Sequence, residues 1–375
     1  MNRRNFLFSS ALGSAALVTS LDVGAQQARG EIVVGQSIDL SGPLQNLGRD
    51  YFTGAKLAFD QANTSGGTGG RKWRFIQLDD GAKPAQAVAN VSRLLTENRA
   101  DVLFGFTGDE CVEAVLTAPA FKASGRLLFA PMSGLASTKT SGRVVYMRAT
   151  YAEEIAAMFR QFTAGNMSSF TIAHATTAGS IATRNAALEL LRKQNAPPPA
   201  LVTLKDDGSN AVALATGIAR NPPHALVIIA DTVPAALLVR ELRSRAPGML
   251  IGITSAVDAT ALQQILGAEL SFGLLVSRVV PNPNKGTERI VREFSRVLTK
   301  YMDEAPTAAS LEGYIAARAL IETARKSPDA AGTPASLQGM RTLDLGGWEL
   351  LFGNDERASH RVDISMITRS GGLLG

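Results

Sequence analysis

Cysteine is almost absent from this chain of 375 residues, which carries only Cys111. A single cysteine cannot form an intramolecular disulfide, so the fold has to be held together by its core. Cys111 does not lie at a signal-cleavage site, and a lipid anchor through it is therefore excluded. Only His174, His224 and His360 are available to activate a thiol, and none lies in a catalytic motif. We therefore interpret Cys111 as a small buried residue and not as a nucleophile.

The common motifs of catalysis and metal binding are also missing. The chain has no G-x-S-x-G nucleophile elbow, no H-E-x-x-H pair and no His, Cys and carboxylate cluster at metal spacing. The glycine-rich segment 64–72 (TSGGTGGRK) precedes a predicted strand, and its lysine is followed by Trp73. It therefore fits a flexible connection with a helix C-cap better than a phosphate-binding loop. We expect no enzymatic activity, no metal and no cofactor.

Long apolar runs and one-sided charge are both lacking. The formal net charge is +5, but lysine and arginine are mixed with acids and form no basic stripe, which argues against nucleic-acid binding. The start of the chain combines Arg3 and Arg4 with an apolar run from Phe6 to about Val18 and small residues before Gln26. This pattern predicts a twin-arginine signal peptide over residues 1–25. No stretch is long enough to span a membrane, so we expect an exported protein without membrane insertion after signal removal.

Alternation between β-rich runs and amphipathic helices dominates the rest of the chain. This pattern predicts an α/β fold with parallel sheets. Some predicted strands are continuous apolar runs, such as 225–230 (ALVIIA), as expected for strands covered on both faces. The length predicts two domains, with one group of units before about Thr150 and one after it. Two helical stretches and two strand-like segments beyond Val280 indicate that the chain crosses between domains more than once.

Five segments, in order along the chain, carry a resemblance to a known family. They are 33–63 (VVGQSIDLSGPLQNLGRDYFTGAKLAFDQAN), 66–95 (GGTGGRKWRFIQLDDGAKPAQAVANVSRLL), the pair VLFGFTG and LLFAPMSG, then SRVVPNP, and SLEGYIAARALIETAR. Together they resemble the periplasmic binding proteins of the leucine/isoleucine/valine-binding type. These are the solute receptors of ABC importers. The resemblance implies a monomeric periplasmic receptor that captures a small polar solute, such as an amino acid or another small carboxylate or amide, and delivers it to the permease subunits of an ABC transporter.

The resemblance also implies a specific fold. Two doubly wound parallel-sheet lobes would be joined by three hinge crossings and close over the solute. One lobe would comprise residues 31–149 and 281–336, and the other residues 150–280 and 337–375. The loop 36–50 (QSIDLSGPLQNLGRD) would follow the first strand, with Ser41-Gly42-Pro43 setting a turn and Leu44–Gly48 forming the lip of the cleft.

The expected ligand contacts lie at the carboxyl ends of two strands of the first lobe, where helix N-termini offer unpaired N–H groups. Thr107 and Ser133 can donate hydroxyl hydrogen bonds there, although simple helix capping explains them, and Asp109, equally well. The resemblance implies that a ligand carboxylate is held at Gly108 or Asp109 and at Ser133 or Gly134. The candidate residues of the two loops are Thr107, Gly108, Asp109, Met132, Ser133 and Gly134.

The chain departs from the family pattern at several expected ligand positions. Leu47 stands where the amino-acid binders carry a tyrosine, and Ala178 lies in a second-lobe loop where they carry another. Asp231 and Asp258 are both candidates for the acid that binds an ammonium group, and Tyr151 follows the first crossing, where it could cover the ligand. Asp109, if it faced the cleft, would repel a carboxylate and could instead hold an ammonium or hydroxyl group. The ligand is therefore expected to differ from leucine.

Two other functions remain open at this stage. The same fold can serve as a sensor that reports a solute to a signalling partner. An exported enzyme is the third alternative, and the missing catalytic motifs argue against it.

Overall fold

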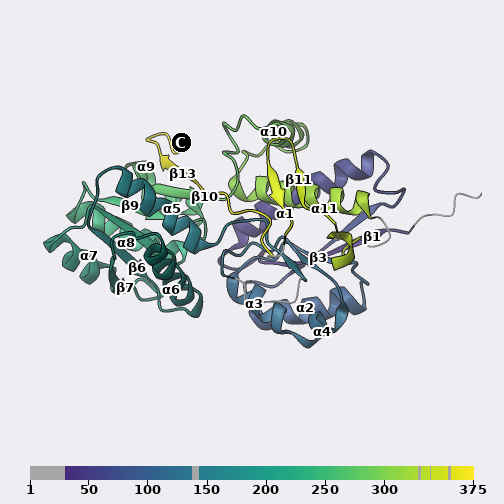
Figure 1. The fold of residues 1–375 in the computed structure, drawn as a ribbon, viewed down its shortest axis with the longest axis horizontal. Coiled ribbons are helices and arrows are strands. Elements are labelled where there is room, and N and C mark those ends of the chain that lie inside the picture. Colours follow the sequence, from purple (N-terminus) through teal and green to yellow (C-terminus); the bar gives the residue numbers. More distant parts are fainter. Residues whose placement is uncertain (1–29, 137–142, 328–330, 338, 354–355) are drawn as a thin grey trace, which may run out of the picture. The chain divides into compact units, whose positions relative to one another are not determined.

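The computed structural model describes residues 30–136, 143–327, 331–337, 339–353 and 356–375. The predicted signal peptide at 1–25 lies outside the described residues. Residues 31–375 cluster as one unit that contains two separate sheets with helices on both faces (Figure 1). Within the described ranges, no helix is both long and apolar enough to cross a membrane.

The first sheet has five parallel strands in the order β2-β1-β3-β4-β5. Alternate residues of each strand enter different cores. Ile32 and Val34 pack on one side, while Val33 packs on the other. The predicted burial of both faces is therefore confirmed. The strands are β1 (Ile32–Ile38), β2 (Trp73–Asp79), β3 (Val102–Phe104), β4 (Leu128–Phe129) and β5 (Val144–Val145).

Two layers of helices cover this sheet. The first core contains residues of α1 (Gln45–Thr64), α10 (Arg289–Tyr301) and α11 (Ala308–Lys326), and the second contains residues of α2 (Pro84–Thr96), α3 (Asp109–Thr117) and α4 (Pro119–Ser124). The backbones of α1 and α11 touch because glycines face each other. A Cβ on Gly54 would lie 1.7 Å from the carbonyl oxygen of Ser310, and one on Gly313 would lie 2.1 Å from that of Tyr51.

The second sheet has the order β14-β13-β10-β9-β8-β6-β7. The pairs from β7 to β10 are parallel, whereas β13 is antiparallel to β10 and β14 is antiparallel to β13. The chain end therefore adds an antiparallel edge to the predicted parallel sheet. The strands are β6 (Phe170–His174), β7 (Ala200–Thr203), β8 (Ala225–Ile229), β9 (Leu250–Ile253), β10 (Leu275–Arg278), β13 (Asp363–Ile367) and β14 (Leu373–Leu374).

Helices also cover both faces of the second sheet. One core contains residues of α5 (Tyr151–Ala164) and α6 (Ala178–Lys193), and the other contains residues of α7 (Ala211–Arg220), α8 (Thr232–Arg245) and α9 (Ala259–Ser271). Val227 of β8 enters the first of these cores, and its neighbours Leu226 and Ile228 enter the second. The continuous apolar run predicted for this strand thus lies at the centre of the sheet.

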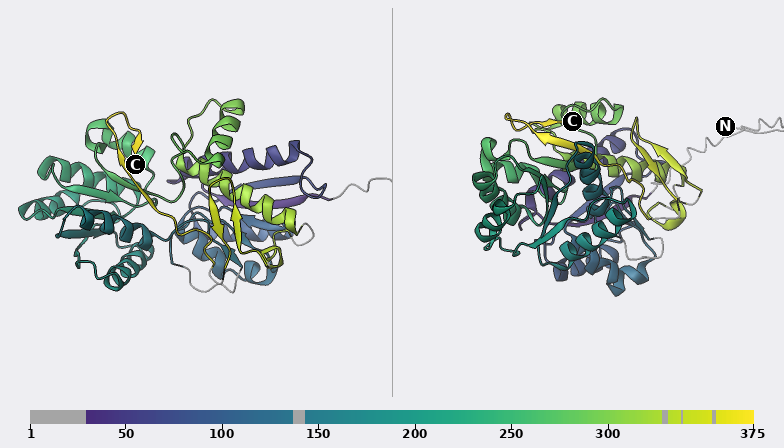
Figure 2. Two further views of the ribbon diagram at one scale, coloured as in Figure 1. Left: turned by 45° about the horizontal axis from the view of Figure 1, so that its top comes forward. Right: turned by 60° about the vertical axis from the view of Figure 1, so that its left-hand side comes forward.

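The segment after residue 336 was predicted to belong wholly to the second lobe, but part of it packs with the first sheet. The short helix η2 (Pro334–Leu337) is followed by a hairpin of β11 (Thr342–Asp344) and β12 (Glu349–Leu351). Trp348 and Leu350 of this hairpin are buried in the core of α1 and α11, and Figure 2 shows the hairpin beside α11. The predicted boundary between lobes at 336 is therefore wrong, because the last apolar residue in this core is Ala358.

Candidate ligand-binding cleft

Asp39 shapes the loop that follows β1. Its carboxylate accepts hydrogen bonds from the N–H groups of Ser41 at 3.1 Å, Gly42 at 2.5 Å and Leu44 at 2.7 Å. A buried carboxylate that accepts several backbone N–H groups fixes a tight turn. The Ser-Gly-Pro turn predicted from the sequence is therefore real, and Asp39, which the sequence analysis did not single out, holds it in place.

The lip predicted at Leu44–Gly48 is wrong beyond its first residue. Helix α1 begins at Gln45, so the residues after Leu44 form its first turn. Leu47 packs against the core of the first sheet and is not among the residues that line the cavity described below. A Cβ on Gly48 would lie 2.0 Å from the carbonyl oxygen of Asp39, so the turn and the helix start are in direct backbone contact.

Two further predicted ligand residues have structural roles. The hydroxyl oxygen of Thr107 accepts a hydrogen bond from the N–H of Asp39 at 3.2 Å, and its side chain is fully buried. Met132 lies in the core of the first sheet, and its N–H donates to the carbonyl of Phe106 at 2.8 Å. Both residues hold the strand-end loops together.

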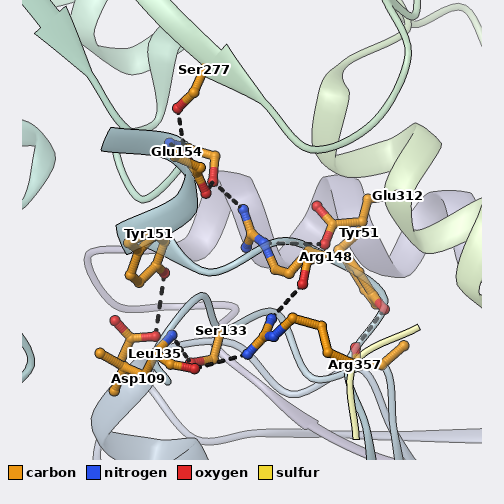
Figure 3. A network of polar contacts seen from close by, with 12 residues as sticks. Tyr51, Asp109, Ser133, Leu135, Arg148, Tyr151, Glu154, Ser277, Glu312 and Arg357 are labelled. Carbon is orange, nitrogen blue, oxygen red and sulfur yellow. Dashed lines mark hydrogen bonds and ion pairs between the residues drawn. The ribbon is translucent and has the colours of Figure 1, made fainter. Parts of the chain in front are cut away.

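Asp109 and Tyr151 meet at the start of α3 and α5. The hydroxyl of Tyr151 donates a hydrogen bond to Oδ1 of Asp109 at 3.3 Å (Figure 3). The N–H of Tyr151 donates to the carbonyl of Gly134 at 2.8 Å, and a Cβ on Gly134 would lie 2.5 Å from the tyrosine ring. The Tyr151 ring therefore packs directly on the backbone of Gly134. Ser133 is buried, its hydroxyl oxygen accepts from the N–H of Leu135 at 3.3 Å, and its side chain lowers the pKa of Asp109.

A cavity of about 390 Å³ opens where the strand-end loops of both sheets meet. Its lining includes the starts of four helices, α3, α5, α6 and α8. The two sheets approach closely here, since a Cβ on Gly179 would lie 4.0 Å from Oδ2 of Asp109. The lining residues are Pro43, Leu44, Ala82, Gly108, Asp109, Glu110, Cys111, Tyr151, Thr177, Gly179, Ser180, Thr183, Ile229, Ala230, Asp231, Thr232, Val233, Pro234, Thr254 and Ala256.

The structure therefore brings together only part of the predicted set. Gly108, Asp109, Tyr151 and Asp231 line the cavity. Ala178 itself does not, although it lies between two residues that do. Asp258 instead caps α9, where its carboxylate accepts from the N–H groups of residues 260 and 261. Ser133 and Gly134 lie behind Asp109 and Tyr151 and not on the cavity wall.

Burial changes the acidity of several groups at the cavity. It raises the pKa of Asp109 to about 6, against the lowering effects of Ser133, Arg148 and Tyr151. Partial burial also raises the pKa of Asp231, and the negative charges of Glu110 and Asp206 raise it further. Burial raises the pKa of Cys111 to about 12, so this thiol stays protonated and is a poor nucleophile. The described residues contain no cluster of His, Cys and carboxylates that could hold a metal ion.

A buried polar network lies behind the cavity, where the chain passes from the first sheet to the second (Figure 3). Arg148 donates to the hydroxyl of Ser255 at 2.5 Å, and its Nε lies 3.6 Å from Oε1 of Glu312. Burial lowers the pKa of Arg148, but the negative charges of Glu312 and other nearby acids raise it by more. The net pKa lies above its usual value, so the guanidinium keeps its charge. Arg148 thus links α11 beside the first sheet to the loop after β9 of the second.

Glu154 of α5 and Arg357 extend this network to the other crossings. The Glu154 carboxylate accepts from the N–H of Ser255 at 2.7 Å and from the hydroxyl of Ser277 at 2.5 Å. Arg357 donates to the carbonyls of Arg148 and Leu135 and packs over the ring of Tyr146. None of these residues was predicted from the sequence. The only sequence signal was a charge within an apolar helical pattern, such as Glu312 in SLEGYIAARAL.

Comparison with known proteins supports the architecture. The family model for periplasmic binding proteins matches residues 31–372. The chain belongs to the periplasmic binding protein family. A substrate-binding periplasmic protein from Ralstonia solanacearum is 25% identical with a TM-score of 0.82 over 92% of this chain and 99% of that one. A possible leucine/isoleucine/valine-binding protein from Rhodopirellula baltica is 26% identical with a TM-score of 0.80 over 93% and 97% of the two chains.

Sequence relatives among curated periplasmic binding proteins match over shorter stretches. An amino acid binding protein of Pseudomonas aeruginosa is 32% identical over 94 residues, which is 25% of each chain. The chain thus spans about a quarter of the curated relatives it matches first. The predicted resemblance to the leucine/isoleucine/valine-binding type is confirmed, as is the predicted fold class. Family membership implies a periplasmic location and a role in solute binding.

Proposed function

We propose that this periplasmic binding protein captures a small solute in the cavity between its two sheets and delivers it to the permease subunits of an ABC importer. The observation that carries this proposal is the composition of the cavity wall. Its residues come from strand-end loops of both sheets, and a Cβ on Gly179 of the second sheet would lie 4.0 Å from Oδ2 of Asp109 of the first. A solute bound there would contact both halves, so its binding energy would favour a closed arrangement.

The two lobes of this proposal follow the two cores. One comprises about 31–149, 281–336 and the hairpin segment to 358, and the other about 150–280 and 359–375. The buried network of Arg148, Glu154 and Arg357 lies at the passages between them and would act as the hinge. We expect a monomer, exported by the twin-arginine route, that performs no chemistry on its ligand.

A thermal-shift screen of the mature chain tests this function. The panel contains amino acids, small carboxylates, aromatic acids, amides and amines, each at saturating concentration. A true ligand at one hundred times its Kd stabilises the folded state by about 2.7 kcal/mol. Turnover of a bound solute, or the absence of any stabilising solute in the panel, would contradict the proposal.

A further inference from the structure

The charged side chains that line the cleft cavity are all acidic. Asp109 and Glu110 come from the first turn of α3, and Asp231 precedes α8 in the second sheet. Among the described residues of the cavity wall, none is lysine, arginine or histidine. The cavity is the site already proposed for solute capture, and its charge concerns which solutes it admits.

Backbone charge does not reverse this balance. A helix N-terminus carries roughly half a positive charge, and four helices begin at the cavity, of which α5 has two acids in its first turn. The N-terminus of α3 has two acids in its own first turn, while the carboxylate of Asp231 precedes α8 without bonding its N–H groups. Only α6 starts without an acid, and there the hydroxyl of Thr177 already accepts from the N–H of Ser180 at 3.2 Å. Carboxylates therefore outweigh the helix dipoles.

The buried cation Arg148 does not line the cavity. Arg148 lies behind Tyr151, with its guanidinium carbon 5.9 Å from the centre of the tyrosine ring. Its Nη2 donates to the hydroxyl of Ser255, and its Nε lies 3.6 Å from Oε1 of Glu312 without a hydrogen bond. Arg148 is not part of the cavity wall and cannot pair with a ligand carboxylate there without leaving these partners.

Glu110 and Asp231 both line the cavity but come from different sheets. The negative charge of Glu110 raises the pKa of Asp231. Closing the cleft would bring these like charges nearer to each other. A cation placed between them would offset the repulsion, so that binding and closure would favour each other.

The rest of the wall is suited to an apolar body. Leu44 and Pro43 contribute from the first sheet's loop, and Ile229, Val233 and Pro234 from the second sheet. Val233 is 57% exposed, so apolar surface is available for a ligand to cover. The cavity volume of about 390 Å³ suits a small organic molecule.

Building on the proposed function, we infer that the cleft takes a small organic amine with an apolar body and no carboxylate, whose ammonium group lies between Glu110 and Asp231. The hydroxyl oxygen of Thr177 and the carboxylate of Asp109 would accept further hydrogen bonds from the ammonium N–H groups. The carboxylate of an amino acid would meet no cationic side chain in this wall. It would instead be repelled by three acidic side chains.

Matched ligand series test the inference by isothermal titration calorimetry. One series is 3-methylbutylamine, leucine and 4-methylpentanoate, and the other is 2-phenylethylamine, phenylalanine and 3-phenylpropanoate. Within a series the apolar body is constant while the ammonium or the carboxylate is removed. We expect the amine to bind at least about tenfold tighter than its carboxylate partner, as a charge-assisted pair is worth this much.

Two variants and a control locate the effect. Glu110→Gln and Asp231→Asn should each weaken amine binding by about 10- to 100-fold. Glu269→Gln removes an exposed acid of α9 outside the cavity and should leave the affinity almost unchanged. Tighter binding of the carboxylate or the amino acid, or equal losses in the control, overturns the inference but leaves solute capture intact. Failure of every compound here and in the wider screen overturns both.

Discussion

The hydroxyl of Tyr151 lies 3.3 Å from Oδ1 of Asp109, and this pair joins the start of α5 to the start of α3. The Tyr151 ring packs on Gly134, and the neighbouring Ser133 lowers the pKa of Asp109, so four residues from three chain segments form one unit. The unit lies between the cavity and the buried network around Arg148. A ligand that contacts Tyr151 or Asp109 therefore touches residues that adjoin the proposed hinge.

Asp109→Asn should stabilise the protein at neutral pH. Burial raises the pKa of Asp109 to about 6, so the folded state binds this proton more tightly than the unfolded chain. Stability from this group is present below about pH 4 and is lost as pH rises through about 6. We expect the variant to gain about 1 to 3 kcal/mol at pH 7.5 and nothing at pH 4. Urea denaturation at both pH values measures this.

The control for that experiment changes one of the groups that shift the pKa of Asp109. These are Ser133, Arg148, Tyr151 and Glu113. Tyr151→Phe removes the hydroxyl donor and should raise the pKa of Asp109 further. The stability of this variant should therefore fall more steeply with rising pH than that of the wild type. A gain in Asp109→Asn of the same size at pH 4 and pH 7.5 would show that its carboxylate does not titrate in this window.

Gly134→Ala should destabilise the unit beneath the cavity. The added Cβ would lie 2.5 Å from the Tyr151 ring, and the ring would have to move. Overpacking of this kind costs about 1 to 3 kcal/mol. The matched control is Gly217→Ala in α7, where nothing lies within 4 Å of the new Cβ and the helix should gain up to about 1 kcal/mol. Equal thermal stabilities of the two variants would contradict the packing of Tyr151 on Gly134.

Much of this region followed from the sequence, and the remainder depended on long-range contacts. Apolar runs and helix periodicity placed the strand ends, so Gly108 and Asp109 were expected at the cavity, where they lie. The roles of individual hydroxyls were not predictable. Thr107 and Asp39 are 68 residues apart, and only their meeting shows that the threonine oxygen already has a partner.

The acids of the second sheet illustrate the same limit. Asp231 and Asp258 both precede helices, and local pattern treats them alike. Only the geometry shows that Asp258 caps α9 while Asp231 borders the cavity. The hairpin around Trp348 was assigned to the wrong lobe for a related reason, since its strand pattern carries no information about which core it enters.

Arg148→Met should cost more stability than any surface ion-pair variant. It leaves Glu312 buried with its charge unpaired, and breaking such a pair costs about 3 to 5 kcal/mol. The double variant Arg148→Met with Glu312→Gln should recover a large part of this loss. The exposed pair Lys56–Asp60 provides the comparison, and Lys56→Met there should cost less than about 1 kcal/mol. Additive losses in the double variant, measured by urea denaturation, would show that Arg148 and Glu312 do not interact.

Thr107→Val separates structural from ligand-binding roles. The variant leaves the N–H of Asp39 without its acceptor and should cost about 1 to 3 kcal/mol of stability. Because Thr107 is not on the cavity wall, the Kd of a bound solute should change less than threefold under conditions where the variant is folded, a difference below about 1 kcal/mol. A large loss of affinity with unchanged stability would instead make Thr107 a ligand contact.

Small-angle X-ray scattering of the mature chain, with and without the solute that stabilises it most, tests whether the two lobes close on the solute. Capture between two lobes predicts that saturating solute lowers the radius of gyration, because the strand-end loops of both sheets close on it. The Arg148→Met variant, if folded, should show a weaker change. An unchanged scattering profile in the presence of demonstrably bound solute would contradict capture by closure.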